Sequence, residues 1–319
     1  MNDANQRARA LVQNFAQVSD PHLSSLEGVR LGELLSKRFL GYLSWSRRRR
    51  FEHRPEVLAA LQRDLQQFDL DQLLVTGDLT HVGLPLEFQQ ALTWLKALGS
   101  PHDVAVIAGN HDASVAAPWQ DTFALWRDYM AADTPTAAPE RLETMFPSLR
   151  ERGKIAFIGL NTACPKPPLM ATGTAGALQL SRLPALLDAA HAKGQFRVVY
   201  LHHSPLPGRD KWRKRLTDAA EVQATICNHG AELVLNGHGH RHHYDELETA
   251  HGMAPLIAIP SASALGLHGA NVASYNCYGV EQTGTGWRLE INSRDYQPGE
   301  GDFVAGESRS LELDRQLKV

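Results

Sequence analysis

Acidic, amide and imidazole side chains occur in this sequence in five short clusters whose composition suits metal chemistry. In chain order the clusters are Asp20-Pro21-His22, Gly77-Asp78, Gly109-Asn110-His111-Asp112, His202-His203 and Gly237-His238-Gly239-His240. Carboxylate oxygens and neutral imidazole nitrogens are good ligands for divalent transition metals. Together the clusters offer more ligands than one tetrahedral zinc site takes. They suit instead two metal ions, about 3.5–4 Å apart, that share a bridging carboxylate.

The clusters follow segments that the sequence predicts to be strands. The predicted strands are Phe15–Ser19, Leu73–Thr76, Val104–Ala108, Ile155–Leu160, Arg197–Leu201 and Leu233–Asn236. Helical patterns alternate with them at Pro55–Phe68, Leu86–Leu98, Pro118–Ala131, Leu178–Ala192 and Asp218–His229. This alternation predicts an α/β fold. Because open α/β sheets place their sites at the carboxyl ends of strands, we expect the five clusters to converge in one crevice.

The helical patterns stop after residue 243. Consecutive predicted strands with glycine turns follow, and they indicate antiparallel pairing: Tyr244–Leu247, Pro255–Ile259, Ser274–Glu281 and Gly286–Asn292. Beyond about residue 298 the sequence is rich in glycine and charge, which predicts a weakly ordered tail. Neither a repeat nor a low-complexity linker divides the chain, so we expect a single domain over residues 1–319.

The five clusters, taken in order, resemble the calcineurin-like metallophosphoesterase superfamily, and the resemblance runs from about Phe15 to His243. It implies a four-layer α-β-β-α sandwich of two mixed sheets flanked by helices, in which the late strands join the second sheet. Phosphoprotein phosphatases of the superfamily usually carry Gly-Asp-x-x-Asp-Arg-Gly, whereas this chain has Gly-Asp-Leu-Thr-His-Val-Gly over residues 77–83. The motifs are closer to the bacterial phosphodiesterase and pyrophosphohydrolase branch.

The resemblance also implies a role for each matching residue. It implies seven ligands to two divalent metal ions such as Mn, Fe or Zn: Asp20, His22 and His240 on the first, Asn110, His202 and His238 on the second, and Asp78 between them. His111 would be catalytic and not a ligand, stabilising charge on the phosphoryl group or protonating the leaving oxygen. Asp112 would support a ligand from behind. His202 is preferred because it ends its predicted strand, and His203 remains the alternative.

The implied reaction is phosphoester hydrolysis, most simply by a phosphodiesterase that uses a metal-bridging hydroxide. Two cations lower the pKa of a shared water and neutralise charge that develops on the phosphate. No protein nucleophile is needed, and the three scattered cysteines are interpreted as small apolar residues. One alternative is a lipid-linked nucleotide pyrophosphohydrolase of the UDP-diacylglucosamine type. Another is a non-catalytic scaffold or a nucleic-acid-binding protein, although the complete ligand set argues against a scaffold.

A basic insert follows the first cluster, from Arg30 to Arg54. It carries a net charge of +6, whereas the rest of the chain carries −9. Its apolar residues fall on one helical face: Leu31, Leu34, Leu35, Phe39, Tyr42 and Leu43. The insert is interpreted either as a helix packed on the core with a solvated basic end, or as a basic amphipathic element that meets an anionic membrane or polyanionic substrate. In either case it should border the crevice.

The composition is that of an ordinary soluble globular protein. The 319 residues are 43% hydrophobic and 21% charged, which argues against disorder, and the net charge of −3 gives no general affinity for nucleic acid. Three unpaired cysteines and no stretch long enough to span a bilayer predict a cytoplasmic protein, with peripheral contact to the inner membrane face left open. The expected partner is a small phosphorylated or lipid-linked substrate; the sequence does not indicate an oligomeric state.

Several other features keep two interpretations. The loop over residues 162–176 is either a substrate lid or a segment ordered by its prolines. The basic run Lys211–Arg215 is a solvated face or a phosphate clamp. His81, three residues after Asp78, either supports a metal ligand or packs a loop. The other histidines outside the clusters are interpreted mainly as structural or solvated: His53, His102, His191, His229, His242, His243, His251 and His268.

Overall fold

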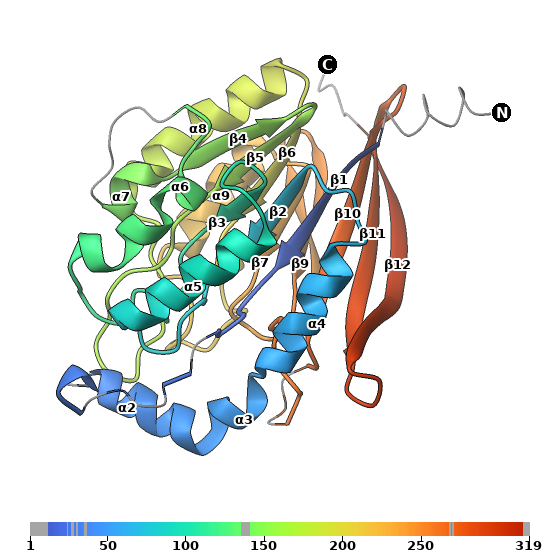
Figure 1. Ribbon diagram of the computed structural model, residues 1–319. Helices are drawn as coiled ribbons and strands as arrows, with labels where there is room; N and C mark the ends of the chain where they lie inside the picture. Colours follow the sequence, from blue (N-terminus) through green and yellow to red (C-terminus); the bar gives the residue numbers. More distant parts are fainter. Residues whose placement is uncertain are drawn as a thin grey trace.

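The computed structural model describes residues 12–23, 25–26, 29, 31–34, 37–134, 141–267, 269 and 271–314. Two six-stranded mixed sheets pack face to face, and helices cover their outer faces (Figure 1). This is the four-layer α-β-β-α sandwich that was expected from the sequence. Aromatic rings fill the space between the sheets: the ring centroids of Phe15 and Phe157, one from each sheet, are 5.1 Å apart.

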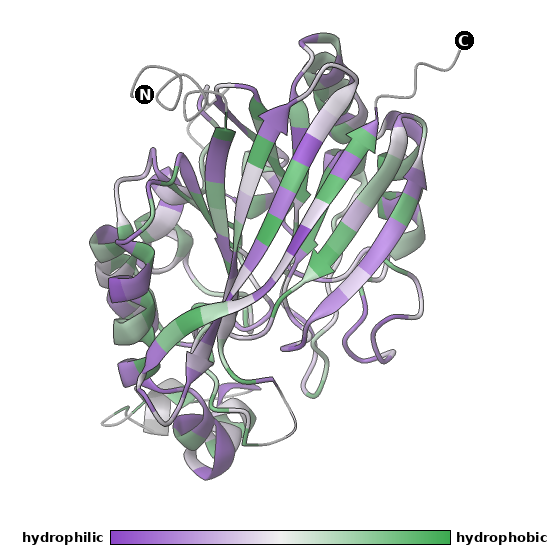
Figure 2. Ribbon diagram, turned by 90° about the vertical axis from the view of Figure 1, so that its right-hand side faces the viewer, coloured by the Kyte–Doolittle hydropathy of each residue, from purple (hydrophilic) through white to green (hydrophobic). Residues whose placement is uncertain are grey.

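The first sheet has the strand order β12-β11-β10-β1-β2-β3. Its strands are β1 (Val12–Val18), β2 (Gln72–Val75), β3 (Val104–Val106), β10 (Ser274–Gln282), β11 (Gly286–Gln297) and β12 (Asp302–Asp314). The first three run parallel, and β10, β11 and β12 form an antiparallel meander attached to β1. Figure 2 shows hydrophobic and hydrophilic residues alternating along the meander, as expected when one face meets the core.

The second sheet has the strand order β4-β5-β6-β7-β9-β8. Its strands are β4 (Ser148–Arg152), β5 (Ile155–Gly159), β6 (Phe196–Tyr200), β7 (Leu233–Asn236), β8 (His243–Thr249) and β9 (Gly252–Ala258). The four central strands are parallel, and the edge strands β4 and β8 are antiparallel to them. Every residue of β5, β6 and β7 is buried, because the other sheet covers one face and helices cover the other.

Four longer helices flank the sheets: α4 (Pro55–Leu65), α5 (Pro85–Leu98), α8 (Ala177–Ala192) and α9 (Ala219–His229). Pro55 and Pro85 begin α4 and α5, where the missing N–H of proline costs no helical hydrogen bond. The buried Glu87 carboxylate accepts the backbone N–H groups of His81 and Leu84, which fixes the loop before α5. Within the described part of the chain, no helix is long and apolar enough to cross a membrane.

Several features of the fold differ from what the sequence predicted. The tail predicted to be weakly ordered after residue 298 contains β12, which pairs along β11 and gains a full ladder of hydrogen bonds. The late strands do not all join the second sheet: β8 and β9 do, whereas β10, β11 and β12 extend the first. The strand β4 was not expected, because its sequence Ser-Leu-Arg-Glu-Arg is short and polar.

The helix predicted over Pro118–Ala131 is also replaced by shorter pieces. These are the 3₁₀ turns η3 (Trp119–Asp121) and η4 (Phe123–Trp126), followed by α6 (Arg127–Met130). The break falls at Thr122, which has non-helical backbone angles and donates its hydroxyl to the Pro118 carbonyl at 2.8 Å. A further single turn, α7 (Leu142–Met145), precedes β4.

The basic insert folds between β1 and β2 as η1 (Leu31–Leu34), α2 (Lys37–Ser44), the π-helical turn η2 (Trp45–Arg49) and α3 (Arg50–Glu52). Leu34 and Trp45 are buried with Leu26, Val82 and Leu84 in a small satellite core. The insert therefore does pack on the body of the protein. Its predicted members Arg30 and Leu35 lie outside the described residues. In Figure 1, α2 and α3 run across the lower end of the sandwich.

Candidate metal centre

All five clusters meet at one end of the sandwich, as the strand order predicted. Asp20 and His22 follow β1, Asp78 follows β2, and Asn110 and His111 follow β3 in the first sheet; His202 follows β6, and His238 and His240 follow β7 in the second. The centre therefore draws on both sheets. The side chains of Asp20, Asp78 and His202 bring ligand atoms within 4.8 Å of one another.

The backbone at the centre is held in a strained conformation. Among the described residues other than glycine, positive φ angles occur at Asp20, His22, Asp78, His238, His240 and Leu169. Five of these six residues belong to the predicted ligand set. Left-handed backbone costs free energy for a residue with a side chain and is concentrated at functional sites, where the surrounding structure enforces it.

One half of the centre is formed by Asp20, His22 and His240. The Nε2 atom of His240 lies 3.2 Å from Oδ1 of Asp20, and the other Asp20 oxygen accepts the His238 backbone N–H at 3.0 Å. His22 donates its Nδ1–H to the Thr80 carbonyl at 3.0 Å, which leaves Nε2 as its acceptor nitrogen. Such an outer hydrogen bond is the usual way to orient a metal-binding imidazole.

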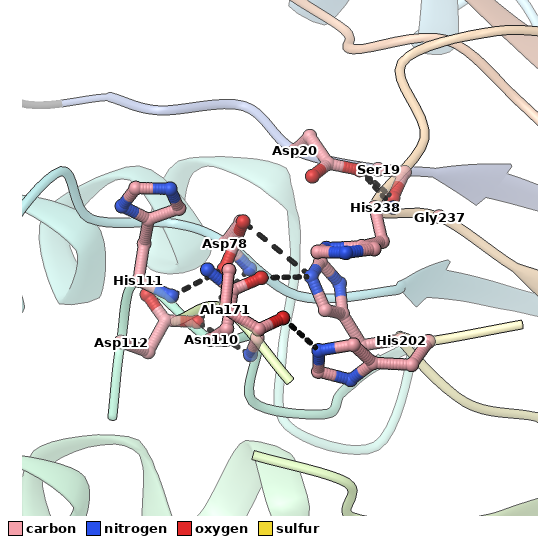
Figure 3. A network of polar contacts seen from close by, with 12 residues as sticks. Ser19, Asp20, Asp78, Asn110, His111, Asp112, Ala171, His202, Gly237 and His238 are labelled. Carbon is pink, nitrogen blue, oxygen red and sulfur yellow. Dashed lines mark hydrogen bonds and ion pairs between the residues drawn. The ribbon is translucent and has the colours of Figure 1, made fainter. Parts of the chain in front are cut away.

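The other half contains Asn110, His202 and His238, with Asp78 next to it (Figure 3). The Nε2 atom of His202 lies 3.4 Å from Oδ2 of Asp78 and 3.3 Å from Oδ1 of Asn110. Its Nδ1–H is donated to the Thr76 carbonyl at 2.8 Å. The buried Nε2 atom of His238 has no hydrogen-bond partner among the described residues. An unsatisfied buried nitrogen costs free energy, and a bound cation would satisfy it, so the donor set fits a metal.

The two adjacent histidines face different surroundings. The His203 ring contacts the Thr162 hydroxyl through Nδ1 at 2.7 Å and the Ala171 carbonyl through Nε2 at 3.2 Å. Both of its nitrogens are therefore occupied by the loop over residues 162–176, although His203 still groups with His202 and His238 by distance. Only the His202 ring contacts Asp78 and Asn110.

His111 lies at the edge of the centre and contacts Asp78 through its backbone. Its backbone N–H is donated to Oδ1 of Asp78 at 2.7 Å. Its ring Nδ1 lies 2.7 Å from the His81 carbonyl and 3.0 Å from Nη1 of Arg49. The ring lies next to His22, with ring centroids 5.1 Å apart, and its action on a substrate stays a prediction.

Asp112 supports the centre from behind and does not face it. Its carboxylate accepts the backbone N–H groups of Asp78, Thr80 and Gly109 at 2.8–3.0 Å, together with the Thr80 hydroxyl. Gly109 lies so close to Asp78 that a Cβ atom there would collide with the Asp78 carboxylate. Burial and the neighbouring Asp78 carboxylate raise the pKa of Asp112 to about 7.

Burial and mutual contact shift the pKa values of the facing groups in opposite directions. Burial would raise the pKa of Asp20, but the facing His240 and the Ser19 hydroxyl bring it down to about 2. Burial would lower the pKa of His202, but the Asp78 and Asp20 carboxylates raise it to about 10. Burial, followed by neighbouring imidazoles, lowers the pKa of His22 and His238 well below its usual range. The lowered pKa values favour the neutral imidazoles of His22 and His238, which are suited to binding a cation, whereas the raised pKa of His202 reflects its pairing with the carboxylates.

Two residues at the centre were not predicted from the sequence. His53, at the end of the insert, groups with His22 and His240, with ligand nitrogens within 4.8 Å of one another. Its Nδ1 lies 2.8 Å from the Ser263 hydroxyl. Arg49 reaches His111 from the same insert. No motif marks either residue; the one available signal was the position of the insert directly after the first cluster.

The basic run Lys211–Arg215 borders a cavity next to the centre. The cavity has a volume of about 790 Å³, and its lining includes Lys211, Lys214, His240 and Arg48. The loop over residues 162–176 meets this region, because the Ala171 N–H is donated to the Arg213 carbonyl at 2.8 Å. The basic run Lys211–Arg215 and the loop over residues 162–176, whose roles the sequence left open, thus both lie around the crevice.

The two-sheet sandwich and a cluster able to hold two divalent metal ions define a metal-dependent phosphoester hydrolase. The profile of the calcineurin-like phosphoesterases matches residues 14–242, and the chain belongs to this family. A dimetal phosphatase from Danio rerio has a similar fold, with a TM-score of 0.55 and 12% sequence identity over 92% of this chain and 98% of that one.

A second solved structure, the NAD nucleotidase of Haemophilus influenzae, matches with a TM-score of 0.48 and 11% sequence identity. That match covers 93% of this chain and 54% of the nucleotidase. No curated protein matches the sequence.

Proposed function

We propose that this protein is a dinuclear-metal phosphodiesterase. The proposed ligands are Asp20, His22 and His240 on one metal ion, Asn110, His202 and His238 on the other, and Asp78 on both. The observation that carries the proposal is the buried Nε2 of His238, which has no hydrogen-bond partner among the described residues, beside a cluster of carboxylates and imidazoles. Mn, Fe and Zn all suit such a nitrogen and oxygen donor set.

Two bound metal ions would supply a shared water of lowered pKa as the nucleophile and would neutralise charge on the phosphate oxygens. Side-chain and backbone groups of this protein then have three tasks. Asp78 holds the two halves together, and its carboxylate is fixed by the His111 N–H. The Thr76 and Thr80 carbonyls set the orientation of His202 and His22. His111 is proposed to act on the substrate, either stabilising charge or protonating the leaving oxygen.

The test is turnover by the full chain after addition of manganese. The substrates are a chromogenic phosphodiester, cyclic nucleotides, glycerophosphodiesters, a nucleotide-sugar lipid and a phosphomonoester. We expect metal-dependent hydrolysis of diesters, and loss of that hydrolysis in Asp78→Ala, together with a fall in bound metal below two per chain. The exposed Asp121→Ala serves as the control. Two tightly bound metals and normal turnover in Asp78→Ala would contradict the assignment.

A second candidate function is hydrolysis of a lipid-linked nucleotide pyrophosphate, and it is favoured by the rim of the crevice. Large apolar side chains are exposed on four segments of this rim. They are Phe39, Leu40 and Phe51 on the insert, Leu169 on the loop over residues 162–176, Trp212 on the basic run, and Leu267. The segments are joined by hydrogen bonds. Lys37 reaches the Met170 carbonyl at 2.9 Å, and Glu52 accepts the Leu267 N–H at 2.9 Å.

Basic side chains accompany these apolar residues. Arg47 and Arg50 are exposed on the insert, and the Arg50 guanidinium lies over the Phe51 ring at 4.6 Å. Exposed apolar and basic groups together are what an anionic membrane surface attracts. The adjoining basic cavity is large enough for a charged head group. These features support a substrate that is located in a membrane. The test of this candidate function substitutes exposed arginines of the insert.

A further inference from the structure

Arg49 differs from the other arginines of the run Arg47–Arg50. Arg47, Arg48 and Arg50 are exposed, whereas Arg49 is partly buried. The difference arises from the π-helical turn η2, which Arg49 ends and which the buried Trp45 begins. A π-helical turn widens the helix by one residue and thereby changes the direction of a side chain, and such turns are frequent at functional sites.

The guanidinium of Arg49 has an unsuitable partner in the protein. Its Nη1 lies 3.0 Å from Nδ1 of His111, and the same Nδ1 lies 2.7 Å from the His81 carbonyl. A carbonyl can only accept a hydrogen bond, so Nδ1 carries the hydrogen and cannot also accept one from Arg49. Within the described residues, no carboxylate forms an ion pair with Arg49. A cation thus lies at the edge of the centre, and the one polar contact of its guanidinium within the described part of the chain, with Nδ1 of His111, does not use its donor.

A partly buried cation without a counter-ion is costly, and an anion at this place would offset the cost. Burial lowers the pKa of Arg49, and the charges of the Asp78 and Glu87 carboxylates partly oppose this effect. Neither carboxylate forms an ion pair with the guanidinium among the described contacts. Among the side chains that the structure describes, none supplies this anion, so a bound substrate is the candidate that would supply it. Arg49 adjoins His111, and the backbone N–H of His111 is hydrogen-bonded to Asp78. An anion bound to Arg49 would therefore also border the two halves of the centre.

We propose that Arg49 is a phosphate-binding residue, whose guanidinium binds the nonbridging oxygens of the phosphoryl group beside His111. The inference rests on the proposed function and deepens it, since it adds a binding contact from the insert to the site. A guanidinium offers two parallel N–H groups, which match two phosphate oxygens in a way that the ammonium of lysine does not. The insert then has a direct role in the crevice, separate from any role at a membrane.

The experiment measures binding of inorganic phosphate to the manganese-loaded full chain by calorimetry, with metal content determined on the same samples. Arg49→Gln should weaken phosphate binding by roughly 10–100-fold while keeping both metal ions, because one charge-assisted contact is lost. Arg49→Lys should keep the charge and lose only part of the affinity. Arg47→Gln, on the exposed face of the same helix, should bind phosphate like the wild type.

Wild-type affinity in Arg49→Gln with both metals present would overturn the proposal, and so would loss of a metal ion, since Arg49 would then act on the structure of the centre. If Arg49→Gln does not fold, an affinity in Arg49→Lys equal to that of the wild type would count against bidentate binding. Hydrolysis of the chromogenic diester by the wild type is measured in parallel. Its absence, combined with Arg49-dependent phosphate binding, would contradict the phosphodiesterase proposal and leave the role of Arg49 in place.

Discussion

At the scale of single residues, the centre combines strained backbone with tightly held side chains. Asp20 and His22 both have positive φ angles, and each is fixed by hydrogen bonds from a neighbouring loop. The Asp20 N–H is donated to the Gly77 carbonyl at 3.0 Å, and the Ser261 hydroxyl to the Asp20 carbonyl at 2.6 Å. Strain of this kind persists only when surrounding contacts enforce it. The contacts thus preorganise the carboxylate and imidazole groups for cations.

The first residue-scale prediction concerns His111→Ala. Because its backbone and not its ring contacts Asp78, truncation of the ring should leave both metal ions bound. Turnover of a diester with a poor leaving group should fall by about 10²–10⁴-fold if the ring acts as a general acid. The fall should be smaller with a good leaving group such as nitrophenolate. The measurement is kcat for the two substrates, with metal analysis of the same protein.

His81→Ala is a poor control, because the His81 ring stacks on His22 with centroids 5.2 Å apart. The exposed His102, which pairs with Asp103, is better suited, because it precedes β3 and so lies at the opposite end of that strand from Asn110 and His111. His102→Ala should leave kcat unchanged. Loss of a metal ion from His111→Ala would move His111 into the ligand set and contradict its proposed role.

The sequence was sufficient to predict the clusters but not the whole centre. Asp20, Asp78 and His238 could be found because their residue types recur at fixed short spacings after strands. His53 and Arg49 could not, because they belong to an insert whose path depends on packing of Trp45 and on the π-helical turn. Neither packing nor a one-residue widening of a helix leaves a periodic pattern in the sequence.

At the scale of elements, the insert is the feature with the most consequences for function. One face is anchored, since Trp45 and Leu34 are buried, and the end of α3 is fixed by Glu52, which accepts the backbone N–H groups of Gly266 and Leu267. The opposite face exposes Phe39 and Leu40. The same short element thus points Arg49 inward and leaves Arg47, Arg48 and Arg50 exposed.

The element-scale prediction separates a membrane role from a role in the crevice. Arg47→Ser combined with Arg50→Ser removes two exposed charges but leaves Arg49, which contacts His111, and Arg48, which lines the cavity. If the insert meets an anionic membrane, each arginine contributes about 1 kcal/mol, so binding to phosphatidylserine vesicles should weaken by roughly 30-fold. Turnover of a lipid-linked substrate should fall, and turnover of a small diester should not.

The matched control is the pair Arg127→Ser and Arg182→Ser, two exposed arginines on α6 and α8. That variant should bind vesicles like the wild type. Unchanged vesicle binding in the insert variant would leave the insert as a packed helix with a solvated face and would remove the support for a lipid-linked substrate. Equal losses on both substrates would instead show that these two arginines support the crevice.

Other elements show why local patterns predicted some boundaries and missed others. The strands β5, β6 and β7 are fully buried apolar runs and were predicted to within one or two residues. β12 is mostly exposed and polar, so its strand character comes from pairing with β11 and not from its own composition. Pairing between segments is a property of the sheet, and the sequence of one strand does not contain it.

At the scale of the whole molecule, the centre is one of the places where polar contacts join the two sheets. The His202 ring, after β6, bonds to the Thr76 carbonyl after β2, and the His238 N–H, after β7, bonds to Asp20 after β1. Deeper in the interface, Gln17 of β1 donates to the Asn236 carbonyl at 3.1 Å. Polar contacts also join the sheets at β4, where Arg150 donates to the Val104 carbonyl at 3.1 Å and Gln13 donates to the Arg152 carbonyl at 2.9 Å. Apolar and aromatic side chains fill much of the space between the sheets. Two metal ions held between the sheets would therefore bind only the folded arrangement.

The last prediction follows from that geometry and concerns removal of metal. A ligand that binds only the folded state stabilises it by about 2.7 kcal/mol at a concentration 100 times its Kd, so for a chain of this length chelation should lower Tm by roughly 4 °C. The measurement is calorimetry of the manganese-loaded protein before and after EDTA, with manganese then restored. Asp78→Ala serves as the control, because without the shared carboxylate its Tm should respond little to either addition. Identical melting of the loaded and stripped wild type would mean that the cluster does not tie the sheets together through metal.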